Sequence, residues 1–84
     1  MSGVLGRLSS QELYAIECVA YEIGDDVNNP DGGLTRDASD EVILETVCDV
    51  VQGGPYCIKI TLDDLSGAMK RHILDFFWKG ANEC

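Results

Sequence analysis

The first regular pattern along the chain is a run of apolar residues at steps of three and four, which is the period of one helix face. The residues on this face are Leu13, Ile16, Ala20 and Ile23. Ser9 precedes them and Glu12 follows it three residues later, so the two can form a capping box. We predict a helix that begins after Ser9 and ends near Gly24, because glycine commonly follows the last helical turn.

A second apolar run is rich in valine and isoleucine, which by composition alone suits a strand. Its acidic residues are spaced four apart, at Glu41, Glu45 and Asp49. In a strand these carboxylates would share a face with apolar side chains, whereas in a helix they form a separate solvated stripe. We therefore predict a helix that is capped by Asp37 or Ser39 and ended by Gly53 in the left-handed conformation.

Residues 56 to 62 alternate apolar and polar side chains, which is typical of a short strand. A lone strand has no ladder partner unless the arm at Val4 and Leu5 or a second chain pairs with it. We predict an extended connection that packs on the core.

The last helix is predicted from a second capping box, formed by Thr61 and Asp64. Its predicted core face consists of Leu65, Met69, Ile73 and Phe76. Gly80 is predicted to end this helix.

Together these elements predict an all-α fold, a compact three-helix bundle with one short extended segment before the last helix. A chain of 84 residues makes one small domain, so we predict a single acidic helical domain over residues 1 to 84, with residues 1 to 7 as a flexible arm. No segment approaches the roughly 20 apolar residues that span a bilayer, and no secretory signal is recognisable, so we expect a cytoplasmic protein.

The chain offers little of the chemistry that catalysis needs. His72 is the only histidine, and Asp75 lies three residues after it. This spacing predicts an ordinary side-chain pair within one helix, not a positioned acid–base partner. The glycines at positions 32 and 33 lack the Lys-Ser or Lys-Thr sequel of a phosphate-binding loop, and the polar loop around them does not fit the ligand pattern of an EF-hand. We expect no enzymatic activity and no cofactor.

The cysteines favour neither zinc binding nor disulfides. There are four of them: Cys18, Cys48, Cys57 and Cys84. Zinc ligands commonly come in pairs separated by two to four residues, and Cys48 and Cys57, the closest pair here, have eight residues between them. We predict reduced thiols, as is usual in the cytoplasm, and no metal site.

Charge is the most informative feature, because the net charge of -9 is concentrated in one half of the chain. Residues 12 to 49 hold eleven acidic residues and one basic residue, Arg36, whereas residues 52 to 84 hold four of each. Such a field repels nucleic acid and anionic membranes and favours association with a basic protein surface. The carboxylates predicted to bind the partner are Glu17, Glu22, Asp25, Asp26, Glu41, Glu45 and Asp49.

Three aromatic residues are also predicted to bind a partner. Tyr14 and Tyr21 lie seven residues apart beside the first core face, and they can form either a helix contact or the face of a homodimer. Trp78 follows Phe76 and Phe77, and because three consecutive helical residues point in different directions, we predict that Trp78 lies off the core. Exposed tryptophan and tyrosine are frequent interface anchors.

In size, charge and absence of catalytic motifs, the chain resembles small inhibitors made by phages and other mobile elements, including anti-CRISPR proteins and DNA mimics. The resemblance is one of type, and it carries over no site residue. It implies a non-enzymatic inhibitor that docks on the nucleic-acid-binding surface of a partner. Two alternatives stay open: a self-associating structural or assembly module, and an immunity protein or antitoxin that neutralises a basic toxin.

Overall fold

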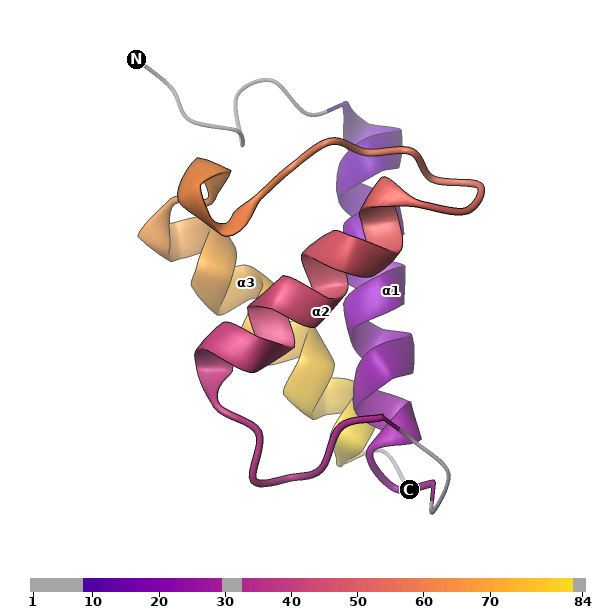
Figure 1. Cartoon of the computed structure of the whole chain (residues 1–84), viewed down its shortest axis with the longest axis vertical. Helices are drawn as coiled ribbons and strands as arrows, with labels where there is room; N and C mark the ends of the chain where they lie inside the picture. Colours follow the sequence, from indigo (N-terminus) through magenta and orange to yellow (C-terminus); the bar gives the residue numbers. More distant parts are fainter. Residues whose placement is uncertain (1–8, 30–32, 83–84) are drawn as a thin grey trace.

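Three α-helices make up most of the fold (Figure 1). The computed structural model describes residues 9 to 29 and 33 to 82. Its elements are α1 (Ser10–Asp26), α2 (Asp40–Gln52), a 3-10 turn η2 (Leu62–Asp64) and α3 (Gly67–Ala81). The described residues contain no strand, and the predicted all-α three-helix bundle is confirmed. The predicted arm and Cys84 lie outside the described residues.

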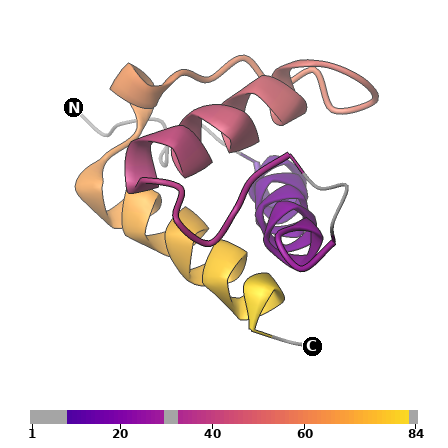
Figure 2. The same ribbon diagram turned by 60° about the horizontal axis from the view of Figure 1, so that its bottom comes forward.

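The helices α1 and α3 run side by side in the same direction, and α2 crosses over them in the opposite direction (Figures 1 and 2). The parallel pairing is also evident from two contacts between them. Glu17 and His72 meet near the middle of the two helices, and Gly24 and Gly80 meet near their ends. The contact of α1 with α3 is the most extensive in the bundle, so these two helices form the base on which α2 packs.

The capping box predicted for α1 is present. The Ser9 hydroxyl accepts a hydrogen bond from the Glu12 amide, and the Glu12 carboxylate accepts one from the Ser9 amide. The prediction that Gly24 ends this helix is wrong, because α1 continues to Asp26 and Gly24 is buried inside it. A Cβ at Gly24 would lie 1.8 Å from the carbonyl oxygen of Phe77, so glycine is required here by the close approach of α3.

The core is formed by apolar side chains from all three helices and from the segment between α2 and η2. Its buried members are Ile16, Val19, Ala20, Leu44, Val47, Cys48, Val51, Ile58, Ile60, Leu65, Met69 and Ile73. The predicted core face of α3 needs one correction, since Phe77 is completely buried and Phe76 only partly. Phe77 lies four residues after Ile73, and it therefore continues the stripe that begins at Met69.

Ser39 caps α2, since its hydroxyl accepts a hydrogen bond from the Val42 amide. The helix ends at Gln52, close to the predicted position, but the residue that takes the left-handed conformation is different. Gly53 is extended, and Gly54 has the positive φ of 59° that turns the chain back along the helix.

The segment after this turn is extended and lies against α2. The Ile58 amide donates a hydrogen bond of 2.7 Å to the Val51 carbonyl, and the Gln52 side chain donates one to the Ile60 carbonyl. Ile58 and Ile60 are buried, whereas the alternate residues Cys57 and Lys59 are exposed. The prediction of an extended connection packed on the core is therefore confirmed.

The predicted start of the last helix is wrong. The Asp64 carboxylate does accept a hydrogen bond from the Thr61 amide, but the turn that this bond closes is only the short η2. The helix α3 begins after Ser66, whose hydroxyl accepts a hydrogen bond from the Met69 amide. The helix ends at Ala81, one residue after the predicted end, and Gly80 is buried within it, where a Cβ would lie 2.1 Å from the Tyr21 carbonyl oxygen.

The carboxyl end of α3 is held by the loop that connects α1 to α2. Arg36 donates hydrogen bonds to the Ala81 carbonyl at 2.7 Å and to the Asn82 side chain at 3.1 Å. Asn28 donates to the same Ala81 carbonyl and accepts a further bond from Arg36. The carboxyl end of a helix carries unpaired carbonyl groups and partial negative charge. A guanidinium at this position donates hydrogen bonds to the carbonyl groups and offsets the charge.

Candidate functional site

The seven carboxylates predicted to bind a partner all reach the surface, and they belong to two groups. Four come from α1, and of these Glu17 is partly buried while Glu22, Asp25 and Asp26 are exposed. The other three are exposed along α2 at Glu41, Glu45 and Asp49. Glu45 and Asp49 line one hollow, Glu17 and Glu22 line another, and the two hollows have no described residue in common.

The carboxylates of α2 are exposed because the opposite face of the helix is buried. Ile43, Val47 and Val51 are completely inaccessible to solvent, and with 3.6 residues per turn Glu41, Glu45 and Asp49 fall on the opposite side of the helix. The predicted acidic stripe is therefore on the surface. Val50 is 42% exposed.

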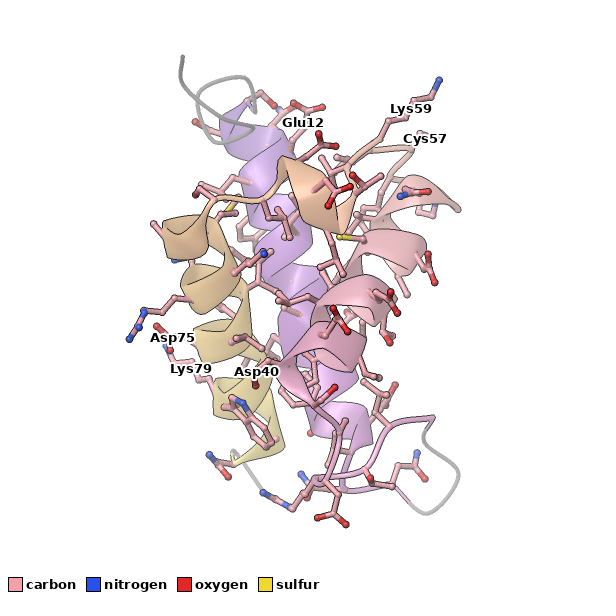
Figure 3. The ribbon with its side chains drawn as sticks, turned by 60° about the vertical axis from the view of Figure 1, so that its left-hand side comes forward. Glu12, Asp40, Cys57, Lys59, Asp75 and Lys79 are labelled. Atoms are coloured by element: carbon pink, nitrogen blue, oxygen red, sulfur yellow. The ribbon has the colours of Figure 1, made fainter. Side chains whose placement is uncertain are left out.

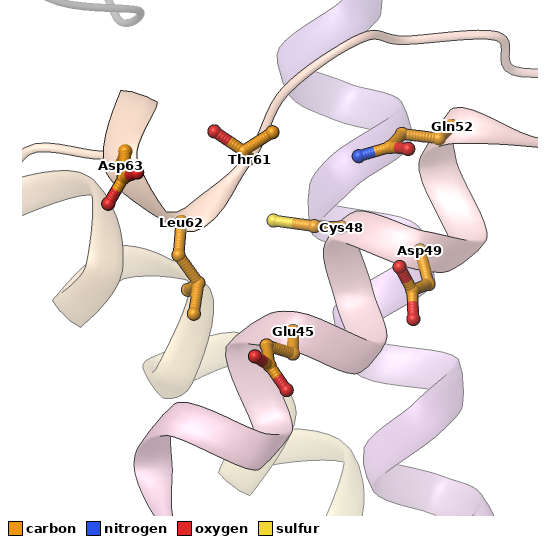
Figure 4. A pocket seen from close by; sticks show the side chains of 7 residues that line it. All are labelled: Glu45, Cys48, Asp49, Gln52, Thr61, Leu62 and Asp63. Carbon is orange, nitrogen blue, oxygen red and sulfur yellow. The ribbon is translucent and has the colours of Figure 1, made fainter.

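Glu45 and Asp49 of this stripe lie on one wall of a groove of about 490 Å³ between α2 and η2, which we call the acidic groove (Figure 4). Its lining residues are Glu45, Cys48, Asp49, Gln52, Thr61, Leu62 and Asp63. Three of these side chains are carboxylates, and the described lining contains no basic residue. A groove of this composition is suited to a positively charged group.

Asp63 is the member of the acidic groove that the sequence did not reveal. It is separated from Asp49 by fourteen positions in the chain, and it reaches the groove only because the extended segment turns back along α2. The hydrogen bond between Ile58 and Val51 and the burial of Ile60 hold that segment in place. In the sequence, Asp63 is distinguished only by its position near a helix start.

Cys48 lines the acidic groove and is buried, with 3% of its surface exposed. Burial is the main cause that raises the pKa of the Cys48 thiol, and the neighbouring carboxylates of Asp49, Asp64 and Glu45 raise it further. A thiolate at this position is opposed by both desolvation and like charge.

The carboxylates of the acidic groove are spread along it and do not converge. Within residues 9 to 29 and 33 to 82, no three histidine, cysteine, aspartate or glutamate side chains are close enough to hold a metal ion. Cys18, Cys48 and Cys57 are free thiols.

The second group of predicted residues lies where α1 meets α3. A hollow of about 240 Å³, which we call the aromatic groove, is lined by Tyr14, Glu17, Cys18, Tyr21, Glu22 and Phe76. The structure thus brings the two predicted tyrosines together with two of the predicted carboxylates. Phe76 was placed in the core by sequence pattern, and its partial exposure beside α1 depends on how the two helices pack.

The Glu17 side chain contacts His72 across the two helices. Its carboxylate lies 2.6 Å from Nε2 of His72 on α3. The sequence predicted a partner for His72 within its own helix, at Asp75, and the structure supplies one from α1 instead. The His72 ring also packs edge-on against Phe76, with centroids 5.1 Å apart. This contact links the charged rim of the aromatic groove to its apolar wall.

Trp78 lies away from the two tyrosines. Its ring packs edge-on against the buried Phe77 ring, with the two centroids 4.8 Å apart. Trp78 also lines a separate groove between α2 and α3. Lys70 and Arg71 line the same groove, together with Asp40 and Asp75. The predicted aromatic residues therefore do not form one surface.

Among residues 9 to 29 and 33 to 82, the basic side chains lie outside the lining of the acidic groove. Arg36 is bound to the end of α3, and Lys59 extends outward from the connection between α2 and η2 (Figure 3). Asp75 and Lys79 lie next to each other on the outer side of α3, where Figure 3 shows both labelled. None of these residues is found in the described lining of the acidic groove.

The comparisons with known proteins give no family for this chain: it matches no protein-family model, no curated protein and no solved structure. Within the described ranges, none of the helices has the length and apolar character that crossing a membrane requires.

Proposed function

We propose that this protein is a non-enzymatic binding module whose acidic groove docks on the basic surface of a partner protein. The observation that carries the proposal is the placement of Glu45, Asp49 and Asp63 around one groove with no basic residue in its described lining. Two of these carboxylates come from α2 and one from η2, so the tertiary fold adds to the negative potential that the stripe creates by itself.

Lysine and arginine side chains of a protein are the partner groups that this groove suits best. Nucleic acid and anionic membranes carry the same sign of charge as the groove and are repelled by it. Single exposed ion pairs contribute only about 0 to 1 kcal/mol each, so useful affinity requires several basic groups to meet the stripe and Asp63 together. A surface that normally binds nucleic acid has such a pattern of basic groups.

An inhibitor is the role that follows most directly. A partner whose basic surface is covered by the acidic groove has lost its site for the phosphate backbone, so binding of this protein and of nucleic acid are expected to compete. Phage-encoded anti-CRISPR proteins and DNA mimics are the type of inhibitor proposed. An immunity protein or antitoxin would use the same groove against a basic toxin, and the identity of the captured partner distinguishes the two roles.

The proposal is tested by binding measurements with variants of equal net charge. A partner is first captured with the full chain, and its dissociation constant is then measured for the wild type, for the double variant Glu45→Gln and Asp49→Asn, and for the control Asp37→Asn and Asp75→Asn. Both double variants remove two exposed carboxylates, but only the first changes the acidic groove.

We expect the groove variant to weaken binding about tenfold, which corresponds to about 1.4 kcal/mol, and the control to weaken it much less. We also expect the difference to shrink as salt is added, because salt screens exposed charges. Equal losses in the two double variants would show that net charge matters and the groove does not, and the proposal would then be wrong. If the partner could bind nucleic acid and this protein at the same time, the inhibitory role would be contradicted.

A further inference from the structure

The aromatic groove combines exposed ring surface with carboxylates on its rim. Tyr14 is 67% exposed, the largest exposure among the bulky apolar residues of the described chain. Tyr21 and Phe76 line the same hollow and are only partly exposed. Aromatic ring faces carry partial negative charge and attract cations.

The rim of the aromatic groove adds formal negative charge to these rings. Glu22 is exposed and makes no hydrogen bond or ion pair with the described residues. Glu17 uses one of its oxygens for His72, and the other remains available. The raised pKa of the Tyr14 hydroxyl, whose main cause is its hydrogen bond with Cys18 and to which the charge of Glu17 contributes, is consistent with negative potential here.

The protein already shows that a cation is attracted to this part of α3. The ammonium of Lys79 lies over the Phe76 ring, 5.5 Å from its centroid. Lys79 is not found in the described lining of the aromatic groove, and the Tyr14 ring is largely exposed.

The size of the aromatic groove indicates what kind of cation fits. Pockets for small-molecule ligands commonly have volumes of about 300 to 1,000 Å³, and the hollow of about 240 Å³ lies below that range. It is suited to one side chain. The planar guanidinium of arginine stacks on an aromatic face and donates hydrogen bonds to a carboxylate at the same time, whereas the ammonium of lysine is compact and strongly hydrated.

We infer that the aromatic groove binds an arginine side chain of a partner protein, with the guanidinium stacked on Tyr14 and bonded to Glu22. This site lies on α1 and α3, shares no described residue with the acidic groove and does not depend on the function proposed for that groove. Arginine and tyrosine are both enriched among the residues that dominate binding energy at interfaces.

A second copy of this chain is a poorer occupant of the aromatic groove. A homodimer through this face would bring Glu17 and Glu22 of both copies together, and like charges across an interface are strongly unfavourable. The two tyrosines that suggested a homodimer are therefore better explained by a cationic partner.

The inference is tested with short peptides and the full chain. Capped tripeptides of the form glycine–X–glycine, in which X is arginine, lysine or citrulline, are titrated into isotope-labelled protein, and chemical shifts are followed by NMR. Citrulline has the shape of arginine without its charge. We expect saturable shifts at Tyr14, Tyr21 and Glu22 with the arginine peptide, weaker binding of the lysine peptide and no saturable shift with the citrulline peptide.

Variants of exposed residues identify the groups that bind. We expect Tyr14→Ala and Glu22→Gln each to raise the dissociation constant of the arginine peptide about two- to fivefold, as for a cation–π contact or ion pair at an exposed site. Tyr14→Phe keeps the ring and is expected to bind as the wild type does. Asp37→Asn changes the net charge as Glu22→Gln does but lies outside the groove, and it is expected to have no effect.

The inference is overturned if the lysine or citrulline peptide binds as tightly as the arginine peptide, or if Tyr14→Ala and Glu22→Gln bind like the wild type. It is also overturned if the shifts of Tyr14 and Glu22 depend on protein concentration without peptide, because a second copy would then occupy the groove. The variant with Glu45→Gln and Asp49→Asn is expected to keep the arginine-peptide shifts, so a failure of the acidic groove leaves this result unaffected.

Discussion

Gly24 of α1 and Gly80 of α3 lie where the two helices are closest, and each has the backbone of the other helix in the place that a Cβ would occupy. A Cβ at Gly24 would lie 1.8 Å from the Phe77 carbonyl oxygen, and one at Gly80 would lie 2.1 Å from the Tyr21 carbonyl oxygen. This contact sets the separation of the two helices, and with it the distance between the walls of the aromatic groove.

Replacement of either glycine by alanine is expected to destabilise the protein severely. The clash is with backbone atoms, which cannot move aside as a side chain can, so we expect a loss of at least about 3 kcal/mol, the upper end of the usual cost of overpacking. The gain in helix propensity, about 1 kcal/mol, does not offset it. The free energy of unfolding is measured by urea titration with circular dichroism.

Gly67→Ala provides the matched control for these two variants. Gly67 is the first residue of α3, and a Cβ there would meet no described atom within 4 Å apart from its chain neighbours and the backbone of its own helix. We expect the stability to stay the same or to rise by up to about 1 kcal/mol. If Gly24→Ala were as stable as Gly67→Ala, the helices would not approach each other as closely as described.

Removal of the Arg36 guanidinium is expected to destabilise the end of α3. Arg36→Gln loses the charged hydrogen bonds to the Ala81 carbonyl and to Asn28, and we expect a cost of about 1 to 2 kcal/mol in the free energy of unfolding. Lys59→Gln removes the same charge from an exposed side chain, and its effect is expected to stay within about 0.5 kcal/mol. Equal effects of the two substitutions would mean that Arg36 contributes only its charge.

The two candidate caps before α3 are expected to differ in their contribution to stability. Ser66→Ala removes the hydroxyl that caps a helix of 15 residues, and we expect a cost of about 1 kcal/mol. Thr61→Ala affects only the 3-10 turn and leaves the bond from its amide to Asp64 intact, so its cost is expected to be smaller. A larger loss for Thr61→Ala in thermal or urea unfolding would place the start of the last helix at Thr61.

Alkaline pH is expected to destabilise the protein through Cys48. Because burial raises the pKa of this thiol above its ordinary value of 9.0, the folded state holds the proton more tightly than the unfolded state does. The contribution to stability is complete below pH 9.0 and is lost as the pH rises toward and through the folded pKa. We expect the free energy of unfolding to fall with pH in this window, and Cys48→Ala to show a smaller slope.

Alkylation provides a second measurement of the same effect. Cys57 is exposed and Cys48 is buried, so iodoacetamide is expected to modify Cys57 well before Cys48 in the folded protein. Modification of Cys48 should require unfolding or strongly alkaline solution. Rapid modification of both thiols at neutral pH would contradict the burial of Cys48.

Much of the local structure could be predicted from sequence because it depends on residues that are near each other in the chain. The cap at Ser9, the helical period of α1 and the acidic stripe of α2 are of this kind, and all three are present. The extended segment with Ile58 and Ile60 buried was also predicted, since alternation of apolar residues is itself a local pattern.

The errors occur where a local signal has two structural meanings. Gly24 and Gly80 have the appearance of helix ends, but they are glycines because another helix packs there. Thr61 and Asp64 have the spacing of a capping box, and the turn they close is followed by Leu65 and Ser66 before the real helix starts. A single glycine does not show whether a helix ends there or another helix packs against it. A capping-box spacing of three residues does not show how long the helix or turn that follows will be.

The residues by themselves determined the helices, the excess of negative charge in residues 12 to 49 and which face of α2 is solvated, because these depend on composition and on periods of a few residues. Only the tertiary structure decided that Asp63 joins Glu45 and Asp49, that Phe76 lines the same hollow as Tyr14 and that Glu17 contacts His72. These groups are far apart along the chain, and their distances follow from how the helices pack. Charge was therefore foreseeable as a property of the chain, and the two grooves that focus it are a property of the fold.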